Sequence, residues 1–336
     1  MAKSIIQYVF YRILRSILSI LGAVIIVFIL SRILPGNPAV AILGPKATPE
    51  NIERVIREWG LDKSYLEQFE VYISRLLRGD LGDSYIMGYS VSKLIAERIP
   101  ASLELVVFAF IISLILGISL GALAAKKHDT KLDLTLTSLS VLSFSSPILL
   151  LGVLLLIFFG VNLGLPVGGR VDPRYSIKTY TGFMLIDTLL SGNFNAFIDA
   201  FIRIIPPALT LAIPLGGLLL KLSRNSILEV MMQDFVKTAK MKKLPERVVM
   251  YKHIIRNALI PIVTIAGIYF AALLTGDVIV ETIFAWPGLG RLVWEAVTLR
   301  DYMVIQGTIL VVSMIYITVN AVVDILYMYI DPRIRG

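Results

Sequence analysis

Long uncharged apolar runs recur along the 336-residue chain and predict membrane-spanning helices. A helix that crosses the hydrocarbon core of a bilayer needs about 20 mostly apolar residues. The runs do not alternate in polarity, as the strands of a membrane barrel would, so helices are the spanning structure that satisfies their backbone groups. Six runs fit this description: 17–34, 105–125, 134–165, 204–220, 258–276 and 303–323.

Prolines interrupt two of these runs. The third is longer than one span requires, and Pro147, preceded by Ser146, is expected to break or kink it. The fourth is short and contains three prolines. We therefore expect six spans, with five as the alternative if the fourth run is re-entrant.

The polar segment after the first run predicts a small helical domain outside the membrane. Thr48-Pro49-Glu50 is typical of a helix start, and apolar stripes at helical spacing follow it over 52–59 and again over 65–76. The fold class is an all-α polytopic membrane protein with an external helical domain. Its predicted parts are an N-terminal segment and first span at 1–34, the external domain at 35–100, a transmembrane core at 101–331 containing a cytoplasmic loop at 223–257, and a tail at 332–336.

The composition narrows the possible functions. With 57% hydrophobic and 17% charged residues, the chain resembles neither a disordered segment nor an ordinary soluble enzyme. It has no cysteine, and its two histidines, His128 and His253, are isolated, so neither thiol chemistry nor a metal site is predicted. It has no phosphate-binding loop of the Walker type, and its first five spans carry no carboxylate relay for proton-driven transport.

The net charge of +8 predicts the orientation in the membrane. Basic residues are in excess on alternate connecting segments, and segments rich in Lys and Arg stay in the cytoplasm. Both termini are therefore expected to be cytoplasmic. The segment 221–256 alone has nine Lys and Arg against three acidic residues. Topology accounts for the charge, so we expect no nucleic-acid partner.

The basic segment also predicts a helix–turn–helix elbow at the membrane surface. Phe235, Ala239 and Lys242 follow one another at helical spacing. Pro245 suits the start of a second helix, and the apolar residues 248–250 would give that helix a buried face. Such an element can dock in a groove of a soluble partner.

This elbow resembles the EAA loop of binding-protein-dependent ABC importer permeases. Lys243 stands where the family has glycine, and lysine adopts a positive φ less readily, so this turn is where the chain departs from the family. The matching residues are Asp234, Thr238, Ala239, Asn257, Ala258, Leu259 and Pro261, while Leu244, Pro245, Glu246 and Arg247 keep the rest of the pattern.

The resemblance extends over about 300 residues to the B-type permeases of oligopeptide and dipeptide importers. Each short motif is weak alone, but their order and spacing match the family. The motifs are Pro35-Gly36-Asn37-Pro38, Gly60-Leu61-Asp62, the segment from Arg78 to Ser84, Ser146-Pro147, the segment from Phe284 to Leu292, and the terminal Asn320, Asp324, Tyr327 and Asp331-Pro332-Arg333.

The resemblance implies a non-catalytic subunit that binds no cofactor itself. Its implied partners are a homologous second permease, two cytoplasmic ATPases that bind ATP and Mg²⁺ and dock on the elbow, and an extracytoplasmic solute-binding protein. The implied substrates are oligopeptides or dipeptides. Because fixed charges that would grip peptide termini are absent, oligosaccharides stay open as an alternative, as do metal complexes. The alternative from another class is a passive channel.

Several residues are candidates for the gate or the pore. Trp286, Pro287, Gly288 and Gly290 predict either an external gate or a surface turn with one interfacial tryptophan. Asn320 and Asp324 lie one turn apart and either hydrogen-bond across helices or line the path. Ser146 and Pro147 complete this set. Gly117 and Gly121 allow close helix approach, either inside the chain or against a partner permease.

Overall fold

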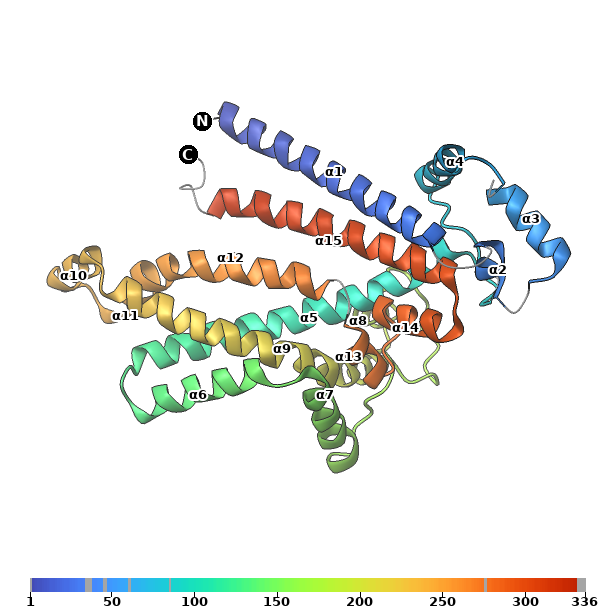
Figure 1. The fold of residues 1–336 in the computed structure, drawn as a ribbon. Coiled ribbons are helices and arrows are strands. Elements are labelled where there is room, and N and C mark those ends of the chain that lie inside the picture. The colour runs from blue at the N-terminus through green and yellow to red at the C-terminus, as the bar shows by residue number, and fades with distance from the viewer. Residues whose placement is uncertain are drawn as a thin grey trace. The chain divides into compact units, whose positions relative to one another are not determined.

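The computed structural model describes residues 2–33, 38–44, 47–59, 62–84, 86–274 and 277–330. Apart from one isolated bridge between Asp83 and Ser90, the regular structure of these residues is helical (Figure 1). The all-α prediction is thus confirmed. The motif residues Pro35, Gly36, Asn37, Gly60, Leu61, Asp331, Pro332 and Arg333 lie outside the described residues, as does the tail at 332–336.

Among the described residues, five helices are long and apolar enough to cross a membrane, and a sixth crossing is possible as a broken pair. The five spans are Val9–Ile29, Val91–Lys126, Phe194–Met231, Glu246–Leu273 and Tyr302–Ile325. They belong to α1 (Ala2–Ile33), α5 (Val91–Lys126), α9 (Phe194–Met231), the segment ending in α12 (Arg256–Leu273), and α15 (Tyr302–Ile330).

The predicted break in the third run is confirmed. Helix α6 (Lys131–Ser145) ends before Ser146, and the chain continues into α7 (Ile148–Leu156) and the π-helix η2 (Ile157–Asn162) at an angle of 102° (Figure 1). Ser146 and Pro147 have extended backbones, with ψ of 130° and 129°. Extended dihedrals at two consecutive residues end the helix, because neither residue continues its hydrogen-bond ladder.

The fourth span is longer than its predicted run of 204–220, and the alternative of a re-entrant fourth run does not fit. Helix α9 is continuous over 38 residues and contains Pro206, Pro207 and Pro214. It lies at the centre of its unit, where α6, α7 and α12 pack against it, and many of its side chains are buried. Packing from neighbouring helices can hold a proline-containing helix together, and here it overrides the local preference of proline. The candidate for a re-entrant segment is therefore the third run.

The chain divides into two compact units. Unit 1 comprises 1–103, 177–192 and 274–321, and unit 2 comprises 104–176, 193–273 and 322–336. The predicted bounds of the external domain, 35–100, fall within unit 1 and stay a prediction.

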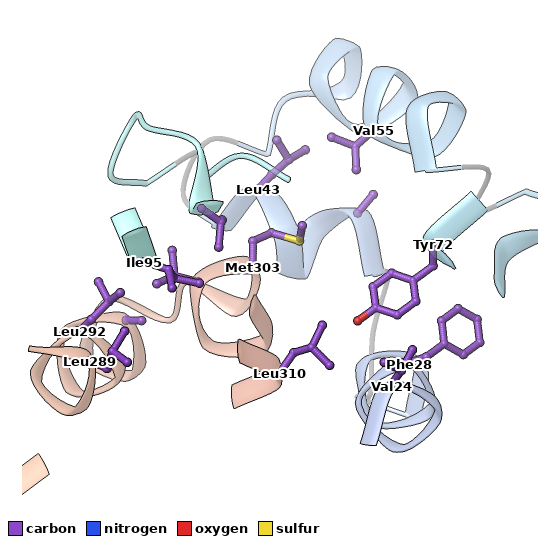
Figure 2. Packing of buried hydrophobic residues seen from close by; sticks show 14 residues of the cluster. Val24, Phe28, Leu43, Val55, Tyr72, Ile95, Leu289, Leu292, Met303 and Leu310 are labelled. Atoms are coloured by element: carbon purple, nitrogen blue, oxygen red, sulfur yellow. The ribbon is translucent and has the colours of Figure 1, made fainter. Parts of the chain in front are cut away.

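Unit 1 has one apolar core to which the predicted external helices contribute. These helices are α2 (Pro38–Leu43), α3 (Pro49–Trp59) and α4 (Tyr65–Leu77). Ser64 caps α4 in a capping box with Glu67, which fixes where that helix begins. Figure 2 shows the core residues, which include Val24 and Phe28 of α1, Val55, Tyr72, Ile95, Leu289, Leu292, Met303 and Leu310.

In unit 2, α5 packs closely on α9 through two glycines. A Cβ added at Gly117 would lie 2.5 Å from the Cβ of Leu219, and one added at Gly121 would lie 2.5 Å from the Cβ of Ser223. Contacts this short leave no room for a side chain, so the glycines serve packing inside the chain. This observation favours internal packing over contact with a partner permease.

Replacing Gly121 with alanine is expected to destabilise the folded chain by about 1–3 kcal/mol, because the new methyl group would overlap the backbone of α9. The midpoint of thermal unfolding in detergent measures this effect. Gly216→Ala is the matched control on the same pair of helices, since its Cβ would meet the backbone of Ser113 at an ordinary 3.7 Å. Equal midpoints for the two variants would contradict the packing described.

The N-terminal end of α9 holds the loop that follows η2. The Asp199 carboxylate accepts hydrogen bonds from the Arg203 Nε at 2.8 Å and from the backbone N–H of Asp172 at 2.6 Å. Arg203 also donates to the carbonyl oxygen of Gly168. The Arg174 guanidinium lowers the pKa of Asp172 to about 2. These bonds keep the 168–174 segment attached to α9.

Candidate functional site

The predicted elbow is a helix–turn–helix in unit 2. Helix α10 (Asp234–Met241) is followed by a turn, α11 (Glu246–Val248) and the π-helix η3 (Val249–Ile255), which continues into α12. Pro245 directly precedes α11 with an extended ψ of 136°, as its fixed φ allows at a helix start. Short π-helical turns inside helices frequently accompany functional sites.

A small core holds the base of the elbow. Ala239 and Ala258, two of the predicted site residues, are 7% and 1% exposed and pack in this core. Phe235, whose spacing from Ala239 predicted this helix, is 43% exposed, and the neighbouring Val236 is buried instead. The buried face of α10 is the side on which Val236 and Ala239, three residues apart, lie toward η3. The spacing of apolar residues along α10 did not reveal which side this would be. The other members of the core are Ala125, Ile227, Val249 and Ile254.

Lys243 adopts the backbone conformation for which the family uses glycine. Its φ is +54°, in the left-handed region. The preceding residue closes α10, with the Lys242 N–H donating to the Thr238 carbonyl oxygen at 3.1 Å. The sequence departs from the family pattern here, but the turn keeps a left-handed residue. A lysine in this region is less stable than glycine by about 1 kcal/mol.

Asp234, Lys237 and Thr238 bond within α10. Lys237 Nζ lies 2.8 Å from Asp234 Oδ1, and this hydrogen bond lowers the pKa of the Asp234 carboxyl. The hydroxyl of Thr238 donates to the carbonyl oxygen of Asp234 at 3.0 Å. A carboxylate at the first turn also meets the positive end of the helix dipole. These residues therefore stabilise α10.

The turn and the start of the second helix form an exposed tip, defined as residues 241–248. All of its residues are exposed, including the predicted Leu244, Pro245, Glu246 and Arg247. Met241 is 75% exposed and Leu244 37%. The tip also carries Lys242, Lys243 and Arg247, so it combines apolar side chains with a positive charge. Such a surface on a packed base suits docking into a partner.

A groove of about 280 Å³ lies beside the elbow. It is formed where α9 ends, α10 begins and α12 begins. Asn257, whose amide donates to the His253 carbonyl oxygen at 2.6 Å, and the exposed Pro261 both line it. Phe235, which the elbow pattern included, lines it as well. The sequence prediction missed the other lining residues, because they come together only where the ends of α9, α10 and α12 meet: Ser226, Glu229, Val230, Gln233 and Ile260.

An ion pair joins α6 and α9 in this unit. Arg224 donates from Nε to Asp133 Oδ1 at 2.6 Å and from Nη2 to Oδ2 at 2.7 Å. His128 Nδ1 lies 3.2 Å from the same carboxylate. Among the described residues, His128, Asp129 and Asp133 form a group with the spacing of metal ligands. The guanidinium already occupies both oxygens of Asp133, so the arrangement fits an ion pair.

In unit 1, the turn between α13 (Val278–Ile283) and α14 (Leu289–Leu299) contains the predicted gate residues Trp286, Pro287 and Gly288, while Gly290 lies in the first turn of α14. Trp286 is 1% exposed, and its Nε1 donates to the Ala101 carbonyl oxygen of α5 at 2.8 Å. Gly288 donates to the carbonyl oxygen of Trp286 across Pro287, at 2.9 Å. The interpretation as a surface turn with an interfacial tryptophan does not fit this burial. The interpretation as a gate stays a prediction.

A buried carboxylate that the sequence prediction missed holds this turn. Glu281 is 1% exposed and accepts hydrogen bonds from Ser102 Oγ at 2.7 Å and from the Arg291 backbone N–H at 2.9 Å. Burial raises the pKa of Glu281, while these donors lower it. A Cβ at Gly288 would lie 2.2 Å from Oε1 of Glu281, and one at Gly290 would lie 2.9 Å from the Val278 nitrogen. Glycine at 288 leaves room for the Glu281 side chain, and glycine at 290 leaves room for the backbone of Val278.

Two of the remaining candidates, Asn320 and Ser146, bond within their own helices. The Asn320 amide donates to the Tyr316 carbonyl oxygen on its own helix, at 3.0 Å. Asp324 is half-buried on the same helix. Ser146 donates to the Leu142 carbonyl oxygen at 2.6 Å where α6 ends, next to Pro147. A role of these four residues in a pore stays a prediction.

Comparison with known proteins covers nearly the whole chain. Residues 117–336 match the family described as binding-protein-dependent transport system inner membrane component. Residues 5–106 match the N-terminal family of the same membrane components.

Named relatives agree with these matches. The chain is 40% identical to the dipeptide transport system permease protein DppB of Haemophilus influenzae, over 98% of this chain and 99% of the relative. It is 37% identical to a protein of the same name from Alkalihalophilus pseudofirmus, over 98% and 99% of the two chains. It is 38% identical to the probable D,D-dipeptide transport system permease protein DdpB of Escherichia coli, over 97% and 98%. The chain therefore belongs to the inner membrane components of binding-protein-dependent transport systems, a family of multi-span permeases rather than enzymes.

Proposed function

We propose that this chain forms half of the translocation pore of an ATP-driven, receptor-dependent peptide importer. A homologous second permease completes the pore, and an extracytoplasmic solute-binding protein delivers the solute. Two ATPase subunits, which bind ATP and Mg²⁺, dock on the elbow from the cytoplasm. When they close on ATP, α10 and α11 move as a rigid body and switch the pore between inward-facing and outward-facing states.

The elbow is the observation that carries this proposal. Its base is a packed core containing Ala239 and Ala258, so the element can transmit a push without melting. Its tip is exposed, apolar and basic. A passive channel would have no use for such a tip, and the family match further favours a component of a larger transport system.

The excess of basic residues supports the orientation. The elbow segment 221–256 carries nine Lys and Arg against three acidic residues, which favours its retention in the cytoplasm. Both termini then lie in the cytoplasm as well, and the α13–α14 turn, with Trp286 and Gly288, lies on the external side. In this position the turn would act as an external gate.

The printed names of the relatives favour peptides as the substrate class. Oligosaccharides stay as the alternative, since the sequence offers no pair of fixed charges for peptide termini. Transport assays with the reconstituted importer and its solute-binding protein separate the two classes. Competition of uptake by dipeptides supports the proposal, and competition only by oligosaccharides or metal complexes would replace the substrate class while leaving the permease role intact.

Replacing Leu244 with aspartate is expected to abolish transport. The tip would then bury an unpaired carboxylate on docking, at a cost of about 3 kcal/mol, or roughly 100-fold in affinity for the ATPases. Because Leu244 is an exposed residue of the tip, the elbow itself should keep its fold. Uptake into proteoliposomes and co-purification of the ATPases with the permease measure the effect.

Tyr180→Asp is the matched control. Tyr180 is a 54% exposed aromatic residue outside the elbow, so the same charge there should leave ATPase binding unchanged. If Leu244→Asp keeps full transport and full ATPase co-purification, the elbow is not the coupling element.

A further inference from the structure

Helix α4 of unit 1 attaches to one end of the membrane span in α1. The ring centroids of Phe28 and Phe69 lie 5.1 Å apart, and those of Phe28 and Tyr72 lie 5.6 Å apart. Figure 2 shows Tyr72 beside Phe28 in the core of the unit. Phe28 lies four residues before Arg32, the first charged residue after the apolar run of α1. Helix α4 therefore packs near the end of the apolar run of α1, where a membrane-spanning helix reaches the headgroups.

Part of the apolar surface of α4 stays exposed outside its contact with Phe28. Leu66, Phe69, Ile73 and Leu77 follow one another at spacings of three and four residues and share one flank of the helix. Leu66 is 72% exposed and Leu77 82%. A shallow groove of about 460 Å³ lies between this flank and the polar face beside it, lined by Phe69, Ile73 and Leu77 together with Glu70, Ser74 and Arg78.

The other sides of α4 have different partners. Gln68 and Tyr72 are buried against the core of unit 1. Glu67, Glu70 and Ser74 are exposed and polar. Around the helix, a face buried in protein is thus followed by an exposed apolar flank and then by a polar face. A helix that lies in the membrane interface, held by its own protein on one side, needs this sequence of faces.

The surface next to the apolar flank is also apolar and exposed. Ile26 and Ile29 of α1 are 58% and 46% exposed on a membrane-spanning segment. The flank of α4 is continuous with this surface through the contact between Phe28 and Phe69. Exposed cations stand at both ends of α4, at Lys63 and Arg78, where they can meet lipid phosphates.

We propose that α4 is an interfacial helix whose flank of Leu66, Ile73 and Leu77 inserts into the lipid surface beside α1. Helices of this kind bury their apolar face about 5–10 Å into the boundary between headgroups and acyl chains. The insertion fixes the depth of unit 1 in the membrane. This inference goes beyond the permease role and needs no ATPase or solute-binding protein.

Site-directed fluorescence tests the proposal directly, because the chain has no native cysteine. Single cysteines at Leu77→Cys and, in a second variant on the same flank, Leu66→Cys are labelled with bimane. The full-length chain, purified with its transport complex, is reconstituted in nanodiscs with brominated phosphatidylcholine. Glu53→Cys on α3 is the aqueous control, because its side chain is 70% exposed and paired with Arg57. Ile26→Cys is the lipid control.

Labels at 77 and 66 are expected to be quenched by the brominated lipid, as the label at 26 is, and shielded from aqueous iodide. The label at 53 should show the reverse. If the labels at 77 and 66 behave like the one at 53, the proposal fails. Shielding that appears only when a soluble component of the transport system is added would likewise overturn it, and would make this flank a protein-docking surface.

Discussion

Replacing Gly288 with alanine is expected to disrupt the turn between α13 and α14 and to abolish transport. The added Cβ would overlap the Glu281 carboxylate, which is fixed by Ser102 and by the Arg291 backbone. Overpacking costs about 1–3 kcal/mol, and separating a buried carboxylate from its donors costs about as much again. The midpoint of thermal unfolding should fall by several degrees, and uptake into proteoliposomes should be lost.

A double-mutant cycle isolates the cause. In a Glu281→Ala background the group that clashes is gone, so Gly288→Ala should add little further destabilisation. Gly22→Ala in α1 is the control for a glycine-to-alanine change, because a Cβ there meets nothing within 4 Å. Additive effects of Gly288→Ala and Glu281→Ala would show that the two residues do not act on each other.

Glycine and proline at position 243 are expected to change the stability of the elbow in opposite directions. Its φ of +54° is accessible to glycine without strain, so Lys243→Gly should stabilise the elbow by about 1 kcal/mol. Proline fixes φ near −65°, so Lys243→Pro would open the turn at a cost of about 3 kcal/mol or more. Transport and ATPase stimulation should survive the first change and be lost in the second, while membrane insertion persists in both.

Lys242→Gly serves as the comparison for Lys243→Gly. Lys242 directly precedes Lys243 and is exposed as well, but it is not among the residues with positive φ. Glycine there should bring no gain, because it only increases the entropy of the unfolded chain. Limited proteolysis of the elbow in detergent measures both variants. If the Lys242→Gly and Lys243→Gly variants resist proteolysis equally, the backbone at Lys243 is not strained.

The spans and the elbow could be predicted because local sequence determines them. The spans follow from uncharged runs of membrane length, and the break in the third run follows from Pro147 after a serine-rich segment. The second helix of the elbow follows from Pro245 directly before Glu246. The full length of helix α9 could not be predicted in this way. Its prolines weaken a helix locally, and the packing of α6, α7 and α12 that overrides them comes from distant parts of the chain.

The site was predicted only in part for the same reason. Ala239 and Ala258 followed from the motif, whereas Val236 depends on which face of a short helix meets η3. Glu281 has no local signature at all. Its donor Ser102 lies 179 residues away in the sequence. The residues next to Glu281 therefore do not indicate that its carboxylate is buried, because its partner is supplied only by the fold.

The length of α9 has a mechanical consequence. At 1.5 Å per residue, its 38 residues span about 57 Å, nearly twice the hydrocarbon thickness of a bilayer. One end of this rod leads into the elbow, and the other holds the 168–174 segment through Asp199 and Arg203. A tilt of about 10° around its midpoint would move the two ends by about 5 Å in opposite directions. Under the proposed coupling, helix α9 would act as a lever that converts a push at one membrane face into a displacement at the other.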